Sequence, residues 1–249
     1  MNTQQELDRT LLEQDFGRDT PMSDSLEAYR QAARMYARIE NAIAVLSDLR
    51  SNRSYIYYGG AGEALDMSPA GTCHEAASIW EKEIFDHIHP DDLVRKHAQE
   101  LRFFHFVKAQ PAPMRSRYYL EMYVRMKAGG GGYVPVRHRM YYVVSQPMGN
   151  IGFALCLYTL CAALLPDALI DSLTGKQVSM GQESCGDLLS KREKEILELI
   201  ARGKTSKEVA DCLSISVHTV SRHRQNILAK LRVDNSIRAL EVAKELRFI

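Results

Sequence analysis

Residues 188–249 of the chain are LLSKREKEILELIARGKTSKEVADCLSISVHTVSRHRQNILAKLRVDNSIRALEVAKELRFI. We expect four short helices here, because a start signal precedes each apolar run. The first two signals are capping boxes, in which a hydroxyl residue stands three residues before a glutamate; the others are single polar caps. The boxes are Ser190–Glu193 and Thr205–Glu208, and the caps are Ser216 and either Asp234 or Asn235. Gly203 stands where the first helix must end.

The second and third helices form a recognisable pair. The second is short, from Ser206 to Cys212, and Leu213-Ser214-Ile215 joins it to a longer third helix. A short helix, a tight turn and a longer amphipathic helix are typical of a helix-turn-helix. At about 100° per residue, apolar residues of the third helix fall on one side and polar or small residues on the other. The apolar side holds Val217, Val220, Ile227, Leu228 and Leu231, and the opposite side holds His218, Ser221, Arg222, Gln225 and Ala229.

The polar side of the third helix predicts contacts with double-stranded DNA. Its donors and acceptors can read base edges, and its small residues allow close approach. The base-reading residues are expected to be His218, Ser221, Arg222 and Gln225. Neighbouring residues are expected to contact phosphates. These are Lys204, Thr205, Ser206, Lys207, Thr219, His223, Arg224 and Lys230.

Periodicity alone leaves open a packed helical bundle with a polar surface, and the motif spacing favours DNA binding. The tail resembles the LuxR-type, or GerE-type, helix-turn-helix family. The matching residues are L-S-x-R-E-x-E-I-L at 189–197, Ile200-Ala201-x-Gly203, Ser206-Lys207-Glu208-Val209-Ala210, Leu213-x-Ile215-Ser216 and T-V-x-x-H-R-x-x-I-x-x-K-L at 219–231.

The resemblance implies a four-helix DNA-binding domain whose third helix enters the major groove. Family members often have lysine after Thr-Val, where this chain has Ser221, and we expect Arg222 to take over base reading. This departure concerns the target sequence rather than DNA binding itself. Family members commonly pair through the fourth helix, and packing inside one domain is the alternative role of its apolar face. That face consists of Ala239, Val242, Ala243 and Leu246.

Charge is unevenly distributed along the chain, although the net charge of the whole is only +1. Residues 189–249 contain 13 basic and 8 acidic residues, which gives +5. The remainder contains 19 basic and 23 acidic residues, which gives −4. Because residues 189–249 are basic and the rest of the chain is acidic, we expect only residues 189–249 to bind a polyanion.

The first fifty residues are predicted to be helical. Apolar residues at spacings of three and four form one stripe, and Pro21 and Ser23 stand where the helix would begin. The stripe consists of Leu26, Tyr29, Ala33, Tyr36, Ile39, Ile43 and Leu46. Packing on the next domain is the simpler role for such a helix, and pairing with a partner helix is the alternative.

The middle of the chain resembles a PAS domain. An aromatic strand is expected at 54–60, and Ile88-His89-Pro90-Asp91-Asp92 precedes a helix that Pro111 and Pro113 end. Three successive strands with turn residues between them then predict an antiparallel meander: the alternating YYLEMYVRM and YVPVRHRMYYVV, and the apolar IGFALCLYTL. We interpret Asp91 and Asp92 as caps at the helix start, which the helix dipole favours, rather than as a catalytic or metal site.

No cofactor, metal or enzymatic activity is expected. Histidines that could face a cavity, such as His97, His105 and His138, have a simpler role as core or surface residues. No His/Cys spacing suggests zinc. Glycine-rich phosphate loops, nucleophile elbows and zinc-hydrolase motifs are missing from the sequence, and Gly129–Gly132 connects two strands.

Cysteine usage and the N-terminus predict a cytoplasmic location. The five cysteines form no Cys-x-x-Cys pair, which suits a reducing compartment, and the first residues lack the apolar run of a signal peptide. No contact with a membrane is expected, since the longest uncharged stretch, 151–165, is shorter than the roughly 18–20 residues of a spanning helix.

The expected architecture is α+β, with four parts. These are a helical segment at 1–50, a PAS-like sensory or dimerisation domain at 51–165, a linker at 166–188 and a LuxR-type helix-turn-helix domain at 189–249. We expect a transcription regulator that binds DNA as a homodimer and receives a small-molecule or protein signal at its PAS-like domain. The alternative is an adaptor whose tail binds partner regulators, and only the regulator would protect a specific DNA site.

Overall fold

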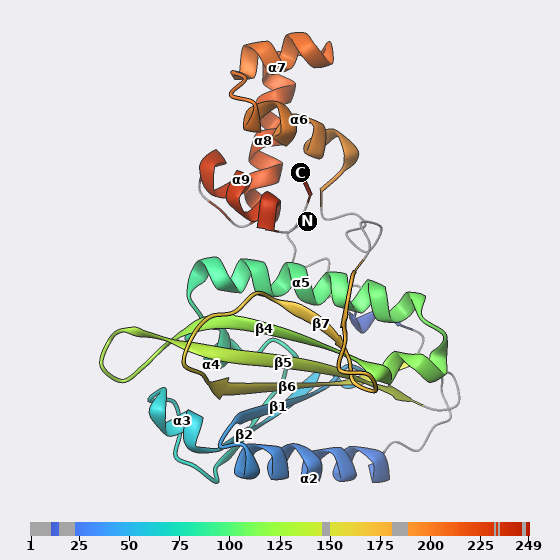
Figure 1. The fold of residues 1–249 in the computed structure, drawn as a ribbon, viewed down its shortest axis with the longest axis vertical. Coiled ribbons are helices and arrows are strands. Elements are labelled where there is room, and N and C mark those ends of the chain that lie inside the picture. The colour runs from blue at the N-terminus through green and yellow to red at the C-terminus, as the bar shows by residue number, and fades with distance from the viewer. Residues whose placement is uncertain are drawn as a thin grey trace. The chain divides into compact units, whose positions relative to one another are not determined.

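The computed structural model describes residues 11–14, 23–145, 150–180, 189–231, 233, 235–245 and 248–249. It separates into two compact units. The first, here called the sheet unit, comprises residues 10–93 and 106–179, and the second contains residues 94–105 and 180–249. Figure 1 shows that the sheet unit combines strands and helices, whereas the C-terminal residues form helices. The mixed fold class with a helical C-terminal domain is thereby confirmed.

One antiparallel sheet dominates the sheet unit, in the order β3-β2-β1-β6-β5-β4-β7-β8. The strands are β1 Ile43–Asp48, β2 Arg53–Tyr58, β3 Cys73–Ala76, β4 Tyr118–Lys127, β5 Tyr133–Ser145, β6 Asn150–Leu160, β7 Ala168–Asp171 and β8 Gln177–Val178. The meander predicted from alternation is confirmed as β4, β5 and β6, and the aromatic strand is confirmed as β2.

Helices connect these strands. They are α2 Ser23–Ile39, α3 Gly60–Ala64, α4 Lys82–Phe85, α5 Pro90–Ala109 and the 3-10 helix η1 Ala112–Arg117. One face of the sheet packs against α2 through a cluster of buried apolar residues. This cluster contains Ala33, Ala37, Ala44, Leu46, Tyr55, Tyr57, Phe153 and Leu157. In the part of the chain that the structure describes, helices are too short or too polar to cross a bilayer.

The expectation that 1–50 is entirely helical was wrong. α2 ends at Ile39, and Asn41 adopts a positive φ of 51° in the turn that follows. Residues 43–48 then form β1, which pairs with β2 on one side and with β6 on the other. All six residues are buried, as in a central strand covered on both faces. A short, continuously apolar run does not distinguish a strand from a buried helix by periodicity alone.

The linker expected at 166–188 is in part a continuation of the sheet. β7 pairs with β4, and β8 pairs with β7. The Arg117 guanidinium also donates to the Asp171 carboxylate over 2.7 Å, which fixes β7 beside η1. These two strands are too short to give a periodic signal. The sheet unit therefore extends beyond 51–165 at both ends, and residues 181–188 lie outside the described residues.

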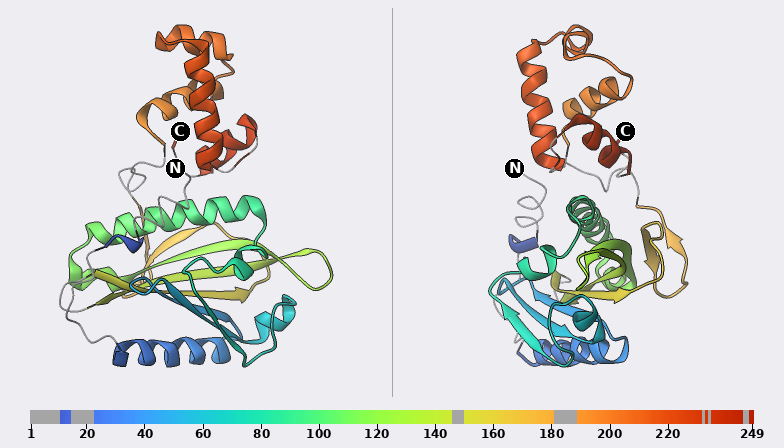
Figure 2. Two further views of the ribbon diagram at one scale, coloured as in Figure 1. Left: turned by 180° about the vertical axis from the view of Figure 1, so that it is seen from behind. Right: turned by 90° about the vertical axis from the view of Figure 1, so that its left-hand side faces the viewer.

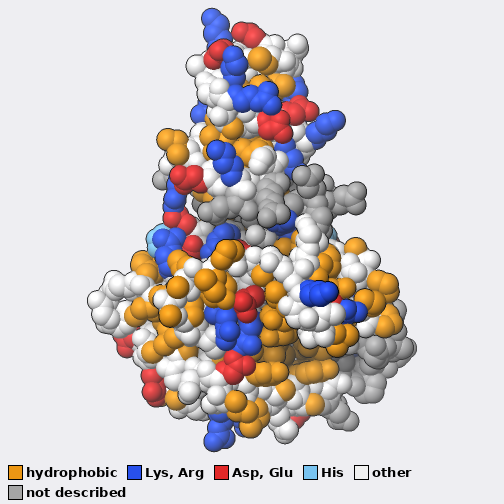
Figure 3. All heavy atoms as spheres, in the orientation of Figure 1, with side chains coloured by type: hydrophobic (Ala, Val, Ile, Leu, Met, Phe, Trp, Pro, Cys, Tyr) orange, Lys and Arg blue, Asp and Glu red, His pale blue; other side chains and the backbone are white. Residues whose placement is uncertain are grey.

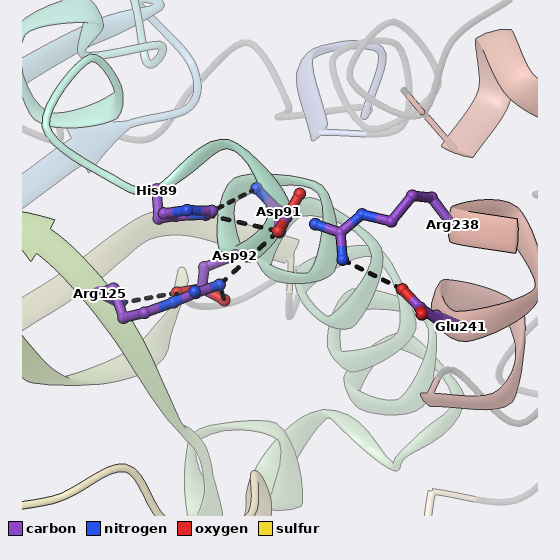
Figure 4. A network of polar contacts seen from close by, with 6 residues as sticks. All are labelled: His89, Asp91, Asp92, Arg125, Arg238 and Glu241. Carbon is purple, nitrogen blue, oxygen red and sulfur yellow. Dashed lines mark hydrogen bonds and ion pairs between the residues drawn. The ribbon is translucent and has the colours of Figure 1, made fainter. Parts of the chain in front are cut away.

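The start of α5 differs from the expected arrangement of caps. The His89 side chain, not Asp91 or Asp92, caps the helix by accepting a hydrogen bond from the Asp91 backbone N–H at 3.3 Å. Asp92 instead accepts from both the backbone N–H and the guanidinium Nε of Arg125 on β4, each at 2.8 Å (Figure 4). The short His-Pro-Asp-Asp element thus fastens the start of α5 to β4.

Candidate nucleic-acid interface

The C-terminal helices are α6 Lys191–Ala201, α7 Ser206–Leu213, α8 Val217–Leu231 and α9 Ser236–Glu245. α8 is the longest of them, and in Figure 2 the others lie around it. Both predicted capping boxes are present, with Ser190 and Glu193 at the start of α6 and Thr205 and Glu208 at the start of α7. Local sequence signals therefore located these helices correctly.

A tight turn orients α8 relative to α7. Ser214 has φ 52° and ψ 45°, a left-handed conformation that ends α7. The Thr219 N–H then donates to the Ser216 hydroxyl over 3.0 Å, which confirms Ser216 as the cap of α8. At α9 the Arg238 N–H donates to Asn235 over 3.0 Å. Asp234, the other candidate cap, lies outside the described residues.

A compact apolar core holds the C-terminal helices together. Its buried residues include Ile196, Leu197, Val209, Ala210, Val220, Ile227, Leu231, Ala239, Val242 and Ala243. The predicted apolar side of α8 is thus confirmed for Val220, Ile227 and Leu231. Val217, expected on the same side, is 46% exposed. It begins α8, where no earlier turn of the helix covers it.

The apolar face expected on α9 does not form a surface. Ala239 is 1% exposed, Val242 7% and Ala243 0%, because all three pack in the core of the C-terminal helices. Leu246, the fourth member of the expected face, lies outside the described residues. Packing inside the domain, rather than dimerisation, accounts for the spacing of these apolar residues.

The four residues expected to read bases share one exposed side of α8. His218, Ser221, Arg222 and Gln225 are all exposed, and Ala229 continues the same side. The side thus carries a guanidinium, an amide, an imidazole and a hydroxyl, which can donate to or accept from base edges. In Figure 3, Lys and Arg side chains are spread over the visible face of the C-terminal helices, with acidic side chains among them.

The residues expected to contact phosphates divide into three groups. Lys207 is exposed beside the start of α7, and Lys204 is exposed and pairs with Glu208 over 3.2 Å. Three residues take part in local structure: Thr205 caps α7, Thr219 bonds Ser216, and His223 is half-buried with its Nδ1 atom inside the domain.

The other members of the expected phosphate set bind groups within the domain. Lys230 lies 2.7 Å from the carboxylate of buried Glu193 and joins α8 to α6. Arg224 donates to the hydroxyl of Ser206 over 2.6 Å and to that of Ser236 over 2.8 Å. Arg224 therefore contacts the first residues of both α7 and α9, and the Ser206 hydroxyl accepts its hydrogen bond from Arg224.

Two glutamates have lowered pKa values for physical reasons visible in these contacts. Burial would raise the pKa of Glu193, but hydrogen bonds from Lys230 and Ser190 outweigh it and lower the pKa below the usual 4.5. The pKa of Glu208 falls to about 2, because the Thr205 N–H and hydroxyl and the Lys204 ammonium all stabilise its carboxylate. Both charges stabilise the helix starts that position α8.

One residue that fixes the helix-turn-helix could not be predicted from helical periodicity. Arg192 on α6 donates from Nη2 to the backbone carbonyl of Leu213 over 2.7 Å. This bond satisfies the last carbonyl of α7, where the turn into α8 begins. Arg192 is the arginine of the L-S-x-R-E motif. The motif therefore marked this residue, but helical periodicity gives no information about its partner.

Comparison with known proteins identifies the C-terminal segment. Residues 187–243 match the family described as bacterial regulatory proteins, luxR family. The uncharacterized response regulatory protein YgeK of Escherichia coli is 48% identical over 60 residues, which cover 24% of this chain and 41% of YgeK. The transcriptional regulatory protein DesR of Bacillus subtilis is 41% identical over 87 residues, 32% of this chain and 43% of DesR. The chain thus spans less than half the length of these relatives, and the C-terminal segment is a LuxR-type helix-turn-helix domain.

Among solved structures, a ligand and DNA complex of Vibrio cholerae VqmA is similar at 14% sequence identity, over 91% of this chain and 88% of VqmA. The TM-score of 0.29 is too low for the likeness to carry an argument about the sheet unit.

Proposed function

We propose that the chain is a sequence-specific, DNA-binding transcription regulator whose α8 enters the major groove. The observation that supports this most strongly is the exposed polar side of α8, presented by a capped helix-turn-helix within the LuxR-type segment. In this proposal His218, Ser221, Arg222 and Gln225 read base edges. Lys204 and Lys207 bind phosphates, because their ammonium groups are exposed at the start of α7, whereas the side chains of Thr205 and Ser206 bond Glu208 and Arg224.

Recovery of bound DNA from the genome tests this function directly. We expect the full-length protein to enrich a limited set of sites that share one sequence, and to protect that sequence from nuclease digestion. A protein that enriches no shared sequence, yet captures another regulator, would instead be the adaptor.

We further propose that the sheet unit is a PAS-like sensory domain. Support comes from the order of its elements: an aromatic strand β2, the His89–Asp92 element leading into α5, and the meander β4, β5 and β6. β1 pairs with β2 on one side and with β6 on the other, so the aromatic strand and the meander belong to one sheet.

The sheet face opposite α2 supports a small-molecule signal. By strand register this face carries buried side chains with polar groups on β2, β5 and β6, namely Tyr58, His138, Tyr142 and Tyr158. Tyr58 bonds Glu83, and the neighbouring Ser47 and Ser54 bond Glu81. The test is to purify the protein under native conditions, denature it, and detect any released small molecule by mass spectrometry. We expect the wild type to release such a molecule and a His138→Phe variant to release less of it. Equal release from both, or none from the wild type, would remove this support.

We also propose that the protein acts as a homodimer, because one helix-turn-helix reads only a half-site of a few base pairs. The surface of α2 supports the sheet unit as the place of pairing. Met35 is 50% exposed, Tyr36 44% and Ile39 72%. Exposed apolar residues gathered on one helix are typical of an interaction surface.

A further inference from the structure

Arg224 is placed differently from the other basic residues of α8. Its two terminal nitrogens donate to two hydroxyls, that of Ser206 at 2.6 Å and that of Ser236 at 2.8 Å. Ser206 is the first residue of α7 and Ser236 the first residue of α9. One guanidinium on α8 therefore connects the starts of two other helices.

The position of Arg224 on α8 separates it from the base-reading side. At about 100° per residue, Arg224 lies on the flank next to Val220 and Leu231, both fully buried. Arg224 itself is half-buried, whereas Arg222 and Gln225 are exposed. Its side chain extends toward α7 and α9 rather than along the exposed side of α8.

The chemistry of the contact favours arginine specifically. The guanidinium is planar and presents its donors in a fixed fork, so that holding two acceptors also fixes their relative direction. Lysine places its charge at one point on a flexible stem and does not impose that geometry. The contact thus constrains the angle of α8 relative to both neighbouring helix starts.

We propose that Arg224 is a positioning residue, which holds α8 at the angle needed for base reading and does not itself bind a phosphate. The inference rests on the proposed DNA-binding function and assigns Arg224 a different role from Lys207. Base recognition depends on placing donors and acceptors within a fraction of an ångström. A residue that fixes the helix angle therefore determines specificity without touching a base.

The two roles predict different responses to salt and sequence. Loss of a phosphate contact weakens binding to all sequences alike and lowers the slope of log affinity against log salt by about one. Loss of a positioning residue leaves that slope unchanged and reduces the ratio of cognate to random affinity. We expect that ratio to fall about tenfold or more, the usual effect of losing one base contact.

The test uses the full-length protein and the DNA sequence that it selects from a random pool. Arg224→Lys keeps the charge and loses the fork, Ser236→Ala removes one acceptor without changing charge, and Ser236→Thr retains a hydroxyl. We expect Arg224→Lys and Ser236→Ala to lose specificity while the slope of log affinity against log salt stays unchanged. Ser236→Thr should keep the specificity of the wild type. Lys207→Ala is the matched control and should lower the slope with specificity intact.

The outcomes separate this inference from the function on which it rests. If the wild type selects no sequence, the proposed function fails. If it does, and Arg224→Lys and Ser236→Ala keep wild-type specificity, the positioning role is wrong. An Arg224→Gln variant that lowers the slope by about one and weakens all sequences equally would instead make Arg224 a phosphate contact. Circular dichroism identifies any variant that fails to fold, and Ser236→Ala then decides the question.

Discussion

The Lys230 ammonium on α8 lies 2.7 Å from the carboxylate of Glu193 on α6, and the Glu193 side chain is only 3% exposed. The same carboxylate accepts a hydrogen bond from the Ser190 N–H at 2.7 Å. One buried charge therefore stabilises the start of α6 and connects α6 to α8.

This arrangement predicts that acid weakens the C-terminal helices. The pKa of Glu193 is lower in the folded protein than its usual 4.5, so its stabilising contribution is complete above pH 4.5. The contribution is lost as the pH falls below 4.5 through the folded-state pKa, because the unfolded chain then binds a proton more readily.

Denaturant unfolding of Glu193→Gln and the wild type measures this contribution. We expect the free energy of unfolding of the variant to be lower by about 1.5–3 kcal/mol near pH 7, the value of hydrogen bonds to a charged group, and the difference to shrink below pH 4.5. Glu198→Gln, an exposed position on the same helix, is the control. A difference independent of pH would show that Glu193 does not act through its charge.

The exposed side of α8 predicts sequence-dependent losses. Arg222→Ala and Gln225→Ala should each cost about 1–3 kcal/mol on the selected DNA and relax its sequence preference, because each removes a base contact. Binding titrations against selected and random DNA measure both effects. If Arg222→Ala weakened both DNAs by the same factor, Arg222 would be a phosphate contact rather than a base reader.

The turn between α7 and α8 predicts opposite effects at two nearby serines. Ser214 has a left-handed φ of 52° that glycine adopts without strain, so Ser214→Gly should raise the free energy of unfolding by about 0.5–1 kcal/mol. Ser216→Ala removes the cap of α8 and should lower it by about 1 kcal/mol. Denaturant unfolding of both variants checks the signs, and destabilisation by Ser214→Gly would contradict the assignment of strain.

Two equally exposed isoleucines provide a test of the proposed dimer surface. Ile39 on α2 and Ile237 on α9 are each 72% exposed. We expect Ile39→Arg to shift the full-length protein from dimer to monomer in sedimentation equilibrium, because it places a charge in the apolar surface of α2. Ile237→Arg should leave the dimer intact, and the reverse result would assign pairing to α9.

Elements of the candidate interface that depend on neighbours in sequence could be predicted. Thr205 and Glu208 bond each other across three residues, and the exposed side of α8 follows from helical spacing. The bonds from Arg224 to Ser236 and from Lys230 to Glu193 could not be predicted, since they join residues 12 and 37 positions apart.

The sheet shows the same limit. Alternation in β4 and β5 was predictable, because each strand buries one face more than the other. β1 is buried on both faces, so its apolar run lacks alternation. For that reason Ile43 and Leu46 of β1 fitted the spacing of the apolar stripe of α2 and were predicted to be helical. β7 and β8 have only four and two residues, too few for a period, and their pairing with distant strands places them in the sheet.

The affinity ratio of the full-length protein for its selected DNA and for random DNA tests the central claim most directly. A base-reading α8 predicts a ratio of about 10³ or more, together with a slope of several units in log affinity against log salt from the surrounding cations. Equal affinity for selected and random DNA at every salt concentration would contradict sequence-specific recognition by α8.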